Sequence, residues 1–367
     1  MGVKTYQQVR GDQYDDLVNT TLANYDAEQG IDQTYGLDAG EKKYKISPVL
    51  ALMREQDKME QGGINYVQVN YDQLPKSGMF NPAATFTSTG VKKTSSQNYE
   101  MGYIVTPVTI LGSDLDKQKG DEVKIVNFVQ GEMDRADLAS AESLAVAVIG
   151  DGTNYWDDAT QSLLTQSARF QADYLPINGF GFGNSTVTNA ILSSTNTYHN
   201  LDRATLATYR VKTHAASALT AAGSTDISSL SGLSFDHVSF LVDESYLGNS
   251  IYANVVVVGK TLWRRFRALA NATHLRMRNE RVYELGYDNI EIDGAVIVCD
   301  RKFARPNQMF SFNPKYTRLK MERAPYFSTP IKVANMYETY STNQYIVAQV
   351  DAQYPQLHSC IYNIPLT

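Results

Sequence analysis

The stretch from residue 121 to residue 150 constrains the fold most, because it is long, free of proline and patterned with a single period. Asp121 follows Gly120 and suits a helix N-cap, and Gly150 suits the position after a helix end. Small or apolar residues recur every three or four positions: Ile125, Val129, Met133, Ala136, Ser140, Leu144 and Val148. This pattern predicts a helix of about 44 Å, either a long core helix or a strut across an extended subunit. Gly131 should weaken it by about 1 kcal/mol and allow a bend.

The residues before this stretch predict an N-terminal arm and a short helix. Residues 1–45 are polar and show no sustained period. Such a segment is either a flexible tail or an arm that becomes ordered against a neighbouring molecule. Ser47-Pro48 provides an N-cap and a proline at the first helical position, so we expect a short amphipathic helix that ends near Met59.

An extended ribbon is predicted between the short helix and the long one. Apolar and polar residues alternate over 64–71 and again over 99–111, as in strands, and Pro107 confines the second strand to a sheet edge or a bulge. The 27 residues between them, 72–98, form an unusually long connection. A two-stranded ribbon is marginally stable alone in water, so we expect it to lie on another molecule. A disordered surface loop is the alternative.

The rest of the chain mixes helices and strands. We expect helices at 158–170, at 203–222 and from Lys260 onward, and strands at 238–242, 251–258, 331–337, 344–350 and 358–364. The alternation between about 190 and 313 is typical of a mixed α/β domain, whereas strand patterns dominate from Tyr316 to the end.

The composition is that of a soluble globular protein. The net charge of −6 argues against nucleic-acid binding over the whole surface and leaves only a local basic patch for it. Cys299 and Cys360 stand in apolar, strand-like runs and are too few for a disulfide framework, so we expect reduced thiols in a cytosolic protein. The N-terminus lacks an apolar leader, and no run reaches the length of a membrane span, so export and membrane insertion are not expected.

No motif in the sequence predicts catalysis, a cofactor or a metal. The five histidines are scattered, without partners at metal-ligand spacing. Ser250 lacks the final glycine of a nucleophile elbow, and Gly259-Lys260-Thr261 lacks the first glycine of a phosphate loop. We therefore expect no catalytic, cofactor-binding or metal residues and no cofactor. A hydrolase with a noncontiguous site, using Ser250 or Asp243, is a distant alternative.

One charge cluster stands out against the acidic background. Between residues 260 and 281, Glu280 is the only acid. The candidate intersubunit contacts are the basic residues of this segment and of the ribbon connection: Lys92, Lys93, Arg264, Arg265, Arg267, Arg276, Arg278 and Arg281. Three interpretations are open: a solvated helix face, pairing with acidic residues of a neighbouring copy, or contact with nucleic acid.

The carboxyl half carries a resemblance to a known family. The segments 284–300 (Glu-Leu-Gly-Tyr to Val-Ile-Val-Cys-Asp), 306–313 (Pro-Asn-Gln-Met-Phe-Ser-Phe-Asn), 316–319 and 345–363 follow one another in an order that resembles tailed-bacteriophage major capsid proteins. The sequence departs from the family pattern at Ala295, where proline is common, and at Ser311. With the ribbon and the long helix, the resemblance covers residues 45 to 367.

This resemblance implies an α+β fold of the Hong Kong 97 type. The implied divisions are an N-terminal arm and short helix at 1–61, an extended β-ribbon (E-loop) at 62–111, a peripheral domain at 112–190 with a spine helix at 121–150, an axial domain at 191–313, and peripheral-domain strands at 314–367.

The family's function follows as an expectation. The chain would be a structural shell protein of the virion, assembled in the host bacterial cytoplasm as pentamers and hexamers around the DNA genome. Its partners would be further copies of itself, scaffold, portal and decoration proteins, and packaged double-stranded DNA, contacted weakly and non-specifically. A nanocompartment shell that encloses a protein cargo is the alternative.

Overall fold

The computed structural model contains the long helix that the apolar stripe predicts. This helix, α5, spans Glu122–Ile149, and its 28 residues give a length of about 42 Å. All the residues of the predicted stripe are buried. The structure describes residues 47–54, 65–70, 94–99, 101–117, 122–149, 154–157, 162–165, 197–198, 201–202, 212–216, 233–246, 251–272, 282–283, 288–300, 307–322, 326–328, 331–332, 339–352 and 354–364. The expected N-terminal arm (1–45) therefore lies outside the described residues, as does the ribbon connection from 71 to 93.

Helix α5 is a core helix at one end and a strut along the rest of its length, so both structures predicted from the sequence are present. Over most of its length one side is exposed, with Lys124, Gln130 and Leu138 facing solvent. Its last six residues, 144–149, are buried all round, none more than 3% exposed. The helix is therefore an amphipathic strut that ends inside the protein core.

A five-stranded antiparallel sheet is built around one long strand. Strand β16, Tyr340–Ala352, pairs along one edge with β3, Gly102–Ile110, and along the other with three shorter strands. These are β13 (Thr317–Met321), β14 (Tyr326–Phe327) and β15 (Ile331–Lys332). Among the described strands β3 pairs only with β16, as expected of an edge strand that contains Pro107.

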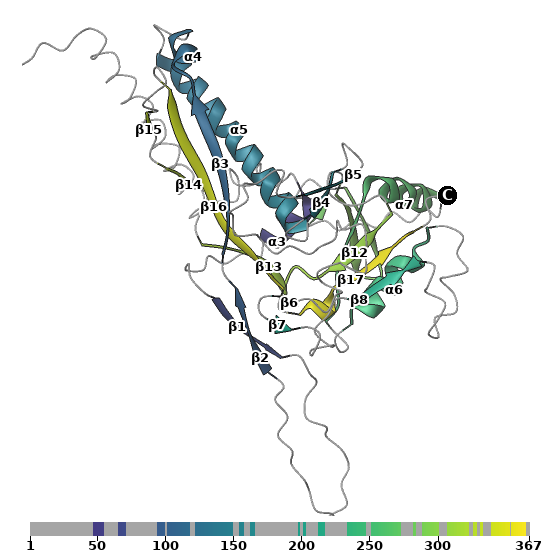
Figure 1. Cartoon of the computed structure of the whole chain (residues 1–367). Coiled ribbons are helices and arrows are strands. Elements are labelled where there is room, and N and C mark those ends of the chain that lie inside the picture. The colour runs from purple at the N-terminus through teal and green to yellow at the C-terminus, as the bar shows by residue number, and fades with distance from the viewer. Residues whose placement is uncertain are drawn as a thin grey trace, which may run out of the picture.

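Helix α5 lies on one face of this sheet and forms a two-layer arm with it, next to the short helix α4, Gly112–Lys117 (Figure 1). The seam between the layers is a strip of apolar side chains: Val108, Ile110, Ile125, Val129, Met133, Ala136 and Tyr340. On the opposite sheet face Tyr103 is 42% exposed and Val105 is 46% exposed, and on the outer side of the helix Leu138 is 57% exposed. The arm thus has a single seam as its core and leaves both outer faces to solvent.

A second, six-stranded mixed sheet forms the body of the molecule. Its order is β10-β11-β9-β12-β17-β8, with β11–β9 and β17–β8 parallel and the other pairs antiparallel. The strands are β8 (Lys212–Ala215), β9 (Val255–Val258), β10 (Asn289–Ile292), β11 (Ala295–Cys299), β12 (Met309–Phe312) and β17 (Ser359–Tyr362). Strand β17 follows the 3-10 turn η4, Pro355–Leu357, so the end of the expected peripheral segment 314–367 lies in this sheet and not in the arm.

The two faces of the six-stranded sheet pack into different cores. Val255, Val257 and Phe310 point into one core, together with the end of α5 and helix α3, Pro48–Arg54. Val256, Val258 and their neighbours point into the other, beneath helices α6, Asp236–Glu244, and α7, Lys260–Ala272. The first core also contains Ile346 and Val350 of the arm sheet, so the end of α5 lies where arm and body meet.

The ribbon is present, but its second strand is not the one the sequence predicts. Strand β1, Asn65–Asn70, pairs antiparallel with β2, Thr94–Tyr99, with Asn65 opposite Tyr99. The expected strand over 99–111 is thus wrong as one element of the ribbon, because β3 leaves it and pairs with β16 in the arm. Alternation continues across the break, so the sequence pattern does not show the change of partner.

Three other elements differ from the sequence prediction. Residues within the expected helix 158–170 form strand β5, Ser162–Thr165, which pairs with β4, Asn154–Asp157. Residues within the expected helix 203–222 form β8, which gains a parallel ladder with β17. The expected strand 238–242 is part of helix α6, because Val238, Leu241 and Val242 fall at helical spacing and are buried together. A short hairpin of β6, Thr197–Tyr198, and β7, Leu201–Asp202, completes the described strands.

Candidate functional site

Helix α7 carries the described part of the predicted basic cluster. Its apolar side is buried against the sheet through Leu262, Trp263, Phe266 and Ala270. Lys260, Arg264 and Arg267 are exposed on the other side, and Arg265 is half-buried. Among the described residues, neither Arg264 nor Arg267 forms an ion pair. The other candidate contacts, Lys92, Lys93, Arg276, Arg278 and Arg281, lie outside the described residues.

Helix α6 carries the opposite charge and was missed by the sequence analysis. It contains three acids and no lysine or arginine. Asp236 and Asp243 are exposed and stand seven residues apart, or about two turns, so they share one face of the helix. Phe235 stacks on Phe266 with ring centroids 5.8 Å apart, which holds the start of α6 against α7. Just before the helix, the Ser234 hydroxyl accepts a hydrogen bond from the Asp236 N–H (3.2 Å).

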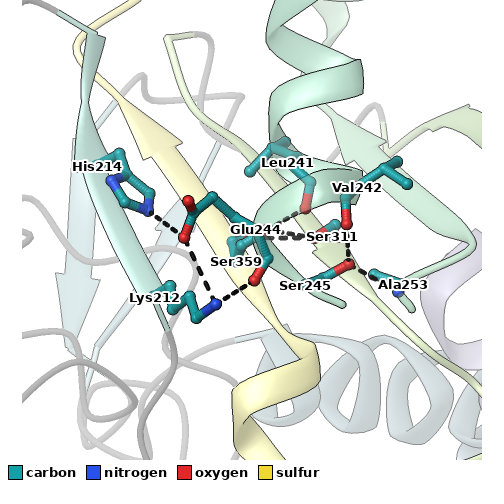
Figure 2. A network of polar contacts seen from close by, with 9 residues as sticks. All are labelled: Lys212, His214, Leu241, Val242, Glu244, Ser245, Ala253, Ser311 and Ser359. Atoms are coloured by element: carbon teal, nitrogen blue, oxygen red, sulfur yellow. Dashed lines mark hydrogen bonds and ion pairs between the residues drawn. The ribbon is translucent and has the colours of Figure 1, made fainter. Parts of the chain in front are cut away.

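A polar network fixes the other end of α6 to the sheet (Figure 2). The Ser359 hydroxyl donates to the Leu241 carbonyl (2.9 Å), and the Lys212 ammonium donates to the Glu244 carbonyl. The Glu244 carbonyl is one of those that a helix end leaves without an intrahelical partner, whereas the Leu241 carbonyl also accepts from the Ser245 N–H (3.2 Å). The lysine also offsets the negative end of the helix dipole. The network therefore positions the acidic helix on the sheet.

The same network holds a carboxylate between two basic groups of strand β8. Glu244 Oε2 lies 3.5 Å from Lys212 Nζ and 3.6 Å from His214 Nε2. Burial lowers the pKa of His214, an effect that Glu244 opposes and Lys212 reinforces. The imidazole is accordingly neutral at neutral pH, packed edge-on against Phe240 with ring centroids 5.0 Å apart.

The buried hydroxyl, imidazole and thiol groups are engaged in packing and hydrogen bonds. The Ser311 and Ser359 hydroxyls lie 2.7 Å apart and neither residue is exposed. Burial raises the pKa of the Cys360 thiol to about 12, so it is protonated and unreactive. The serine hydroxyls of the network thus fix backbone positions, and the Cys360 thiol is held in the core.

His358 gives the body a pH dependence that can be measured. It is fully buried, its Nε2 lies 2.9 Å from Thr317 Oγ1, and burial lowers its pKa from 6.5 to about 3 against an opposing hydrogen bond with the Ser311 backbone. Between pH 6.5 and 3 the unfolded chain binds a proton that the folded chain does not. Stability from this residue is therefore complete above pH 6.5 and falls by about 1.4 kcal/mol per pH unit below it.

Urea unfolding of unassembled subunits at pH 7 and pH 5.5 tests this expectation. We expect the free energy of unfolding to fall from pH 7 to pH 5.5 by about 1 kcal/mol more in the wild-type protein than in His358→Gln. The variant lacks the titrating group. Equal losses in the two proteins would show that His358 is protonated in the folded state as readily as in the unfolded one.

The described residues contain neither a metal-binding cluster nor a membrane-spanning helix. No group of three or more His, Cys, Asp or Glu side chains within them could hold a metal ion. Across the same part of the chain, no helix combines the length and apolar character needed to cross a bilayer.

Sequence comparison finds no match, whereas structural comparison finds solved structures with a similar fold. No protein-family model and no curated protein matches the sequence. The solved capsid asymmetric unit of cyanophage A-1(L) matches with TM-score 0.59 at 14% identity, over 87% of this chain and 93% of that chain. The chain therefore has an α+β phage-capsid fold. The resemblance stated from the carboxyl half of the sequence is thereby confirmed at the level of the fold.

Other capsid folds match less closely. The capsid of a native GTA particle gives a TM-score of 0.49 at 10% identity, over 88% of this chain and 91% of that chain. A virus-like particle from Pyrococcus furiosus gives 0.38 at 9% identity, over 86% and 97%. These two similarities are too loose to carry an argument about the phage-capsid fold or the nanocompartment alternative.

Within this capsid fold the structure brings together only part of the predicted site. Arg264, Arg265 and Arg267 lie on one short helix of the body, as the charge pattern indicates. Asp236 and Asp243 lie on the neighbouring helix on the same sheet face. The two aspartates could have been found from the sequence, because they are seven residues apart and flank apolar residues at helical spacing. The prediction of a strand over residues 238–242 hid this pattern.

Proposed function

We propose that this chain is the major capsid protein of a tailed bacteriophage and that its copies assemble into a closed, icosahedral-type shell of pentamers and hexamers around the DNA genome. The observation that carries the proposal is the match to the cyanophage capsid fold over 87% of this chain and 93% of the other. The shape of the subunit is a second, physical support.

The arm explains why such a chain functions in an assembly. A two-layer arm with one apolar seam buries little surface for its length and exposes both outer faces. Tyr103, Val105 and Leu138 on those faces are large apolar side chains that lose water contact when neighbouring subunits cover them. Specific interfaces bury about 1,600 Å² in total, so a long arm lets one subunit form several of them.

The proposal also assigns roles to the elements. Helix α5 would be the spine helix, the β1–β2 ribbon with its connection the E-loop, the arm sheet the peripheral domain, and the six-stranded sheet the axial domain. We would also assign β17 to the axial domain, because it pairs with β12 and β8, although the expected boundary lies at residue 313. Residues 1–61 would form the N-terminal arm and short helix.

The partners follow from this assignment. Contacts with further copies would dominate, and scaffold, portal and decoration proteins would bind the assembled shell or its precursor. With a net charge of −6, the chain would contact packaged DNA weakly and non-specifically, through local basic groups. The shell would be located in the virion after assembly in the host cytoplasm.

Electron microscopy of the purified protein tests the proposal directly. We expect closed shells once the protein is concentrated under assembly conditions, alone or with scaffold. Monomers or small symmetric rings under every condition would contradict it. Shells that form only around a protein cargo, and exclude DNA, would favour the nanocompartment alternative instead.

A further inference from the structure

Two helices of opposite charge lie on the same face of the six-stranded sheet. Residues of α6 and α7 share one apolar core with the inward side chains of β9, β11 and β17. Figure 1 shows both helices at the end of the molecule opposite α4, away from the two-layer arm. They are therefore in a position to meet another molecule without interference from the arm.

The charge separation between the helices is complete within their sequences. Helix α6 (DHVSFLVDE) has three acids and no lysine or arginine, whereas α7 (KTLWRRFRALANA) has four basic residues and no acid. Asp236 and Asp243 are exposed on the first helix, and Arg264 and Arg267 on the second. Neither arginine has an ion-pair partner among the described residues, so these two charges can meet an acid of another molecule.

The helices are also offset across the sheet. Helix α7 contacts β11, near one edge. The last turn of α6 is bonded to β17 and β8, at the other edge, through Ser359 and Lys212. Asp243 belongs to that last turn, so it lies toward the edge of the sheet away from β11, whereas Asp236 lies at the start of α6, which Phe235 holds against α7.

We propose that the basic face of α7 in one copy binds the acidic face of α6 in the next copy, head to tail. This proposal rests on the proposed shell function and names one contact within it. A heterologous contact of this kind closes into a ring when the rotation between copies allows it. Charge complementarity favours the head-to-tail register and disfavours face-to-face pairing of like helices.

The observations favour a second copy over nucleic acid as the occupant. Nucleic acid would account for Arg264 and Arg267 but would be repelled by Asp236 and Asp243 on the neighbouring helix. A second copy accounts for both helices at once, because its acidic α6 can pair with the basic α7 of the first copy. The acidic net charge of the whole chain points the same way.

Charge reversal of each helix separately tests the contact. Arg264→Glu/Arg267→Glu cancels the net charge of α7 and puts two carboxylates on its exposed face, opposite the acids of α6. Asp236→Lys/Asp243→Lys leaves Glu244 as the single acid of α6 and puts two ammonium groups on its exposed face. We expect either variant, alone, to fold with the wild-type thermal transition and to raise the concentration needed for shell assembly about tenfold or more. Lys117→Glu/Lys315→Glu changes the net charge by the same amount at two exposed positions, the end of α4 and the turn after β12, and should assemble like the wild type.

Mixing the two reversed variants is the sharper experiment. Each is complementary only to the other, so we expect assembly to return in the equimolar mixture. Alternation closes a ring only with an even number of copies, so hexamers should recover more fully than pentamers by native mass spectrometry or microscopy. Variants that assemble alone like the wild type, or a mixture no better than its components, would overturn the proposal.

The remaining outcomes are equally informative. Loss of DNA retention in the arginine variant, with normal shell assembly in both variants, would identify α7 as a nucleic-acid contact and overturn the proposal. If the wild-type protein forms no shell under any condition, the proposed function fails. If the wild-type protein forms shells and the reversed variants do too, only the contact fails.

Discussion

Replacing Met133 by aspartate is expected to unfold the two-layer arm while leaving the six-stranded sheet intact. Met133 is fully buried in the seam between α5 and the arm sheet, against residues such as Val108 and Val129. The substitution removes about 1.5–3 kcal/mol of apolar burial and places a carboxylate in a strip that offers it no basic partner. We expect a total loss of about 4 kcal/mol or more in the free energy of unfolding of the arm.

Hydrogen exchange on unassembled subunits locates this effect. Amides of the first two-thirds of α5 and of β3 should lose protection, whereas those of β9 and β11 should keep it. Leu138→Asp is the matched control, because Leu138 lies on the same helix but is 57% exposed. It should change stability by about 1 kcal/mol or less in the isolated subunit. Wild-type protection in the Met133 variant would show that the seam is not the core of the arm.

Breaking the buried ion pair between β13 and β16 is expected to have the second largest effect. Lys320 Nζ lies 3.3 Å from Asp351 Oδ2, with side chains 8% and 0% exposed. Lys320→Met alone should cost about 3–5 kcal/mol, because it leaves the aspartate buried without its cation. The double variant Lys320→Met/Asp351→Leu should recover most of this loss, since both charges are then absent.

The exposed pair of α4 provides the control for this cycle. Lys117 and Asp114 are closer, at 2.6 Å, but their side chains are 73% and 36% exposed. Lys117→Met should therefore cost at most about 1 kcal/mol, because solvent screens the pair. Similar small losses at Lys320 and Lys117 in urea unfolding would mean that burial does not control the strength of the first pair.

The sequence predicted the long helix well and the shorter elements unevenly, for a physical reason. Most of α5 lies on a sheet, so its period of burial is visible in residues such as Ile125, Val129 and Met133. Short buried segments carry no such signal, because an apolar run of five residues fits a strand or a helix equally. Residues 238–242 (Val-Ser-Phe-Leu-Val) are similarly short and mostly apolar, and their helical state is decided by the packing of α6 on β12 and β17.

The sequence predicted the basic helix of the candidate site but not the acidic one. Arg264 and Arg267 could be found from charge alone, whereas Asp236 and Asp243 required the correct element before their shared face became visible. Pairs such as Lys320 and Asp351 depend on strand register: Arg318 is opposite Asp351, so lysine and aspartate are diagonal neighbours. No local pattern of residues encodes that register.

The burial of the last turns of α5 has a mechanical consequence. Helix α5 has its C-terminal turns packed in the core and its N-terminal part in the arm. A force that pushes the arm sideways therefore acts on the packing around these C-terminal turns. The angle between arm and body is therefore stiff, and swinging the arm requires either repacking around residues 144–149 or flexing the helix itself. Flexing is easiest at Gly131, where a glycine weakens the helix and no neighbouring atom fills the space beside it.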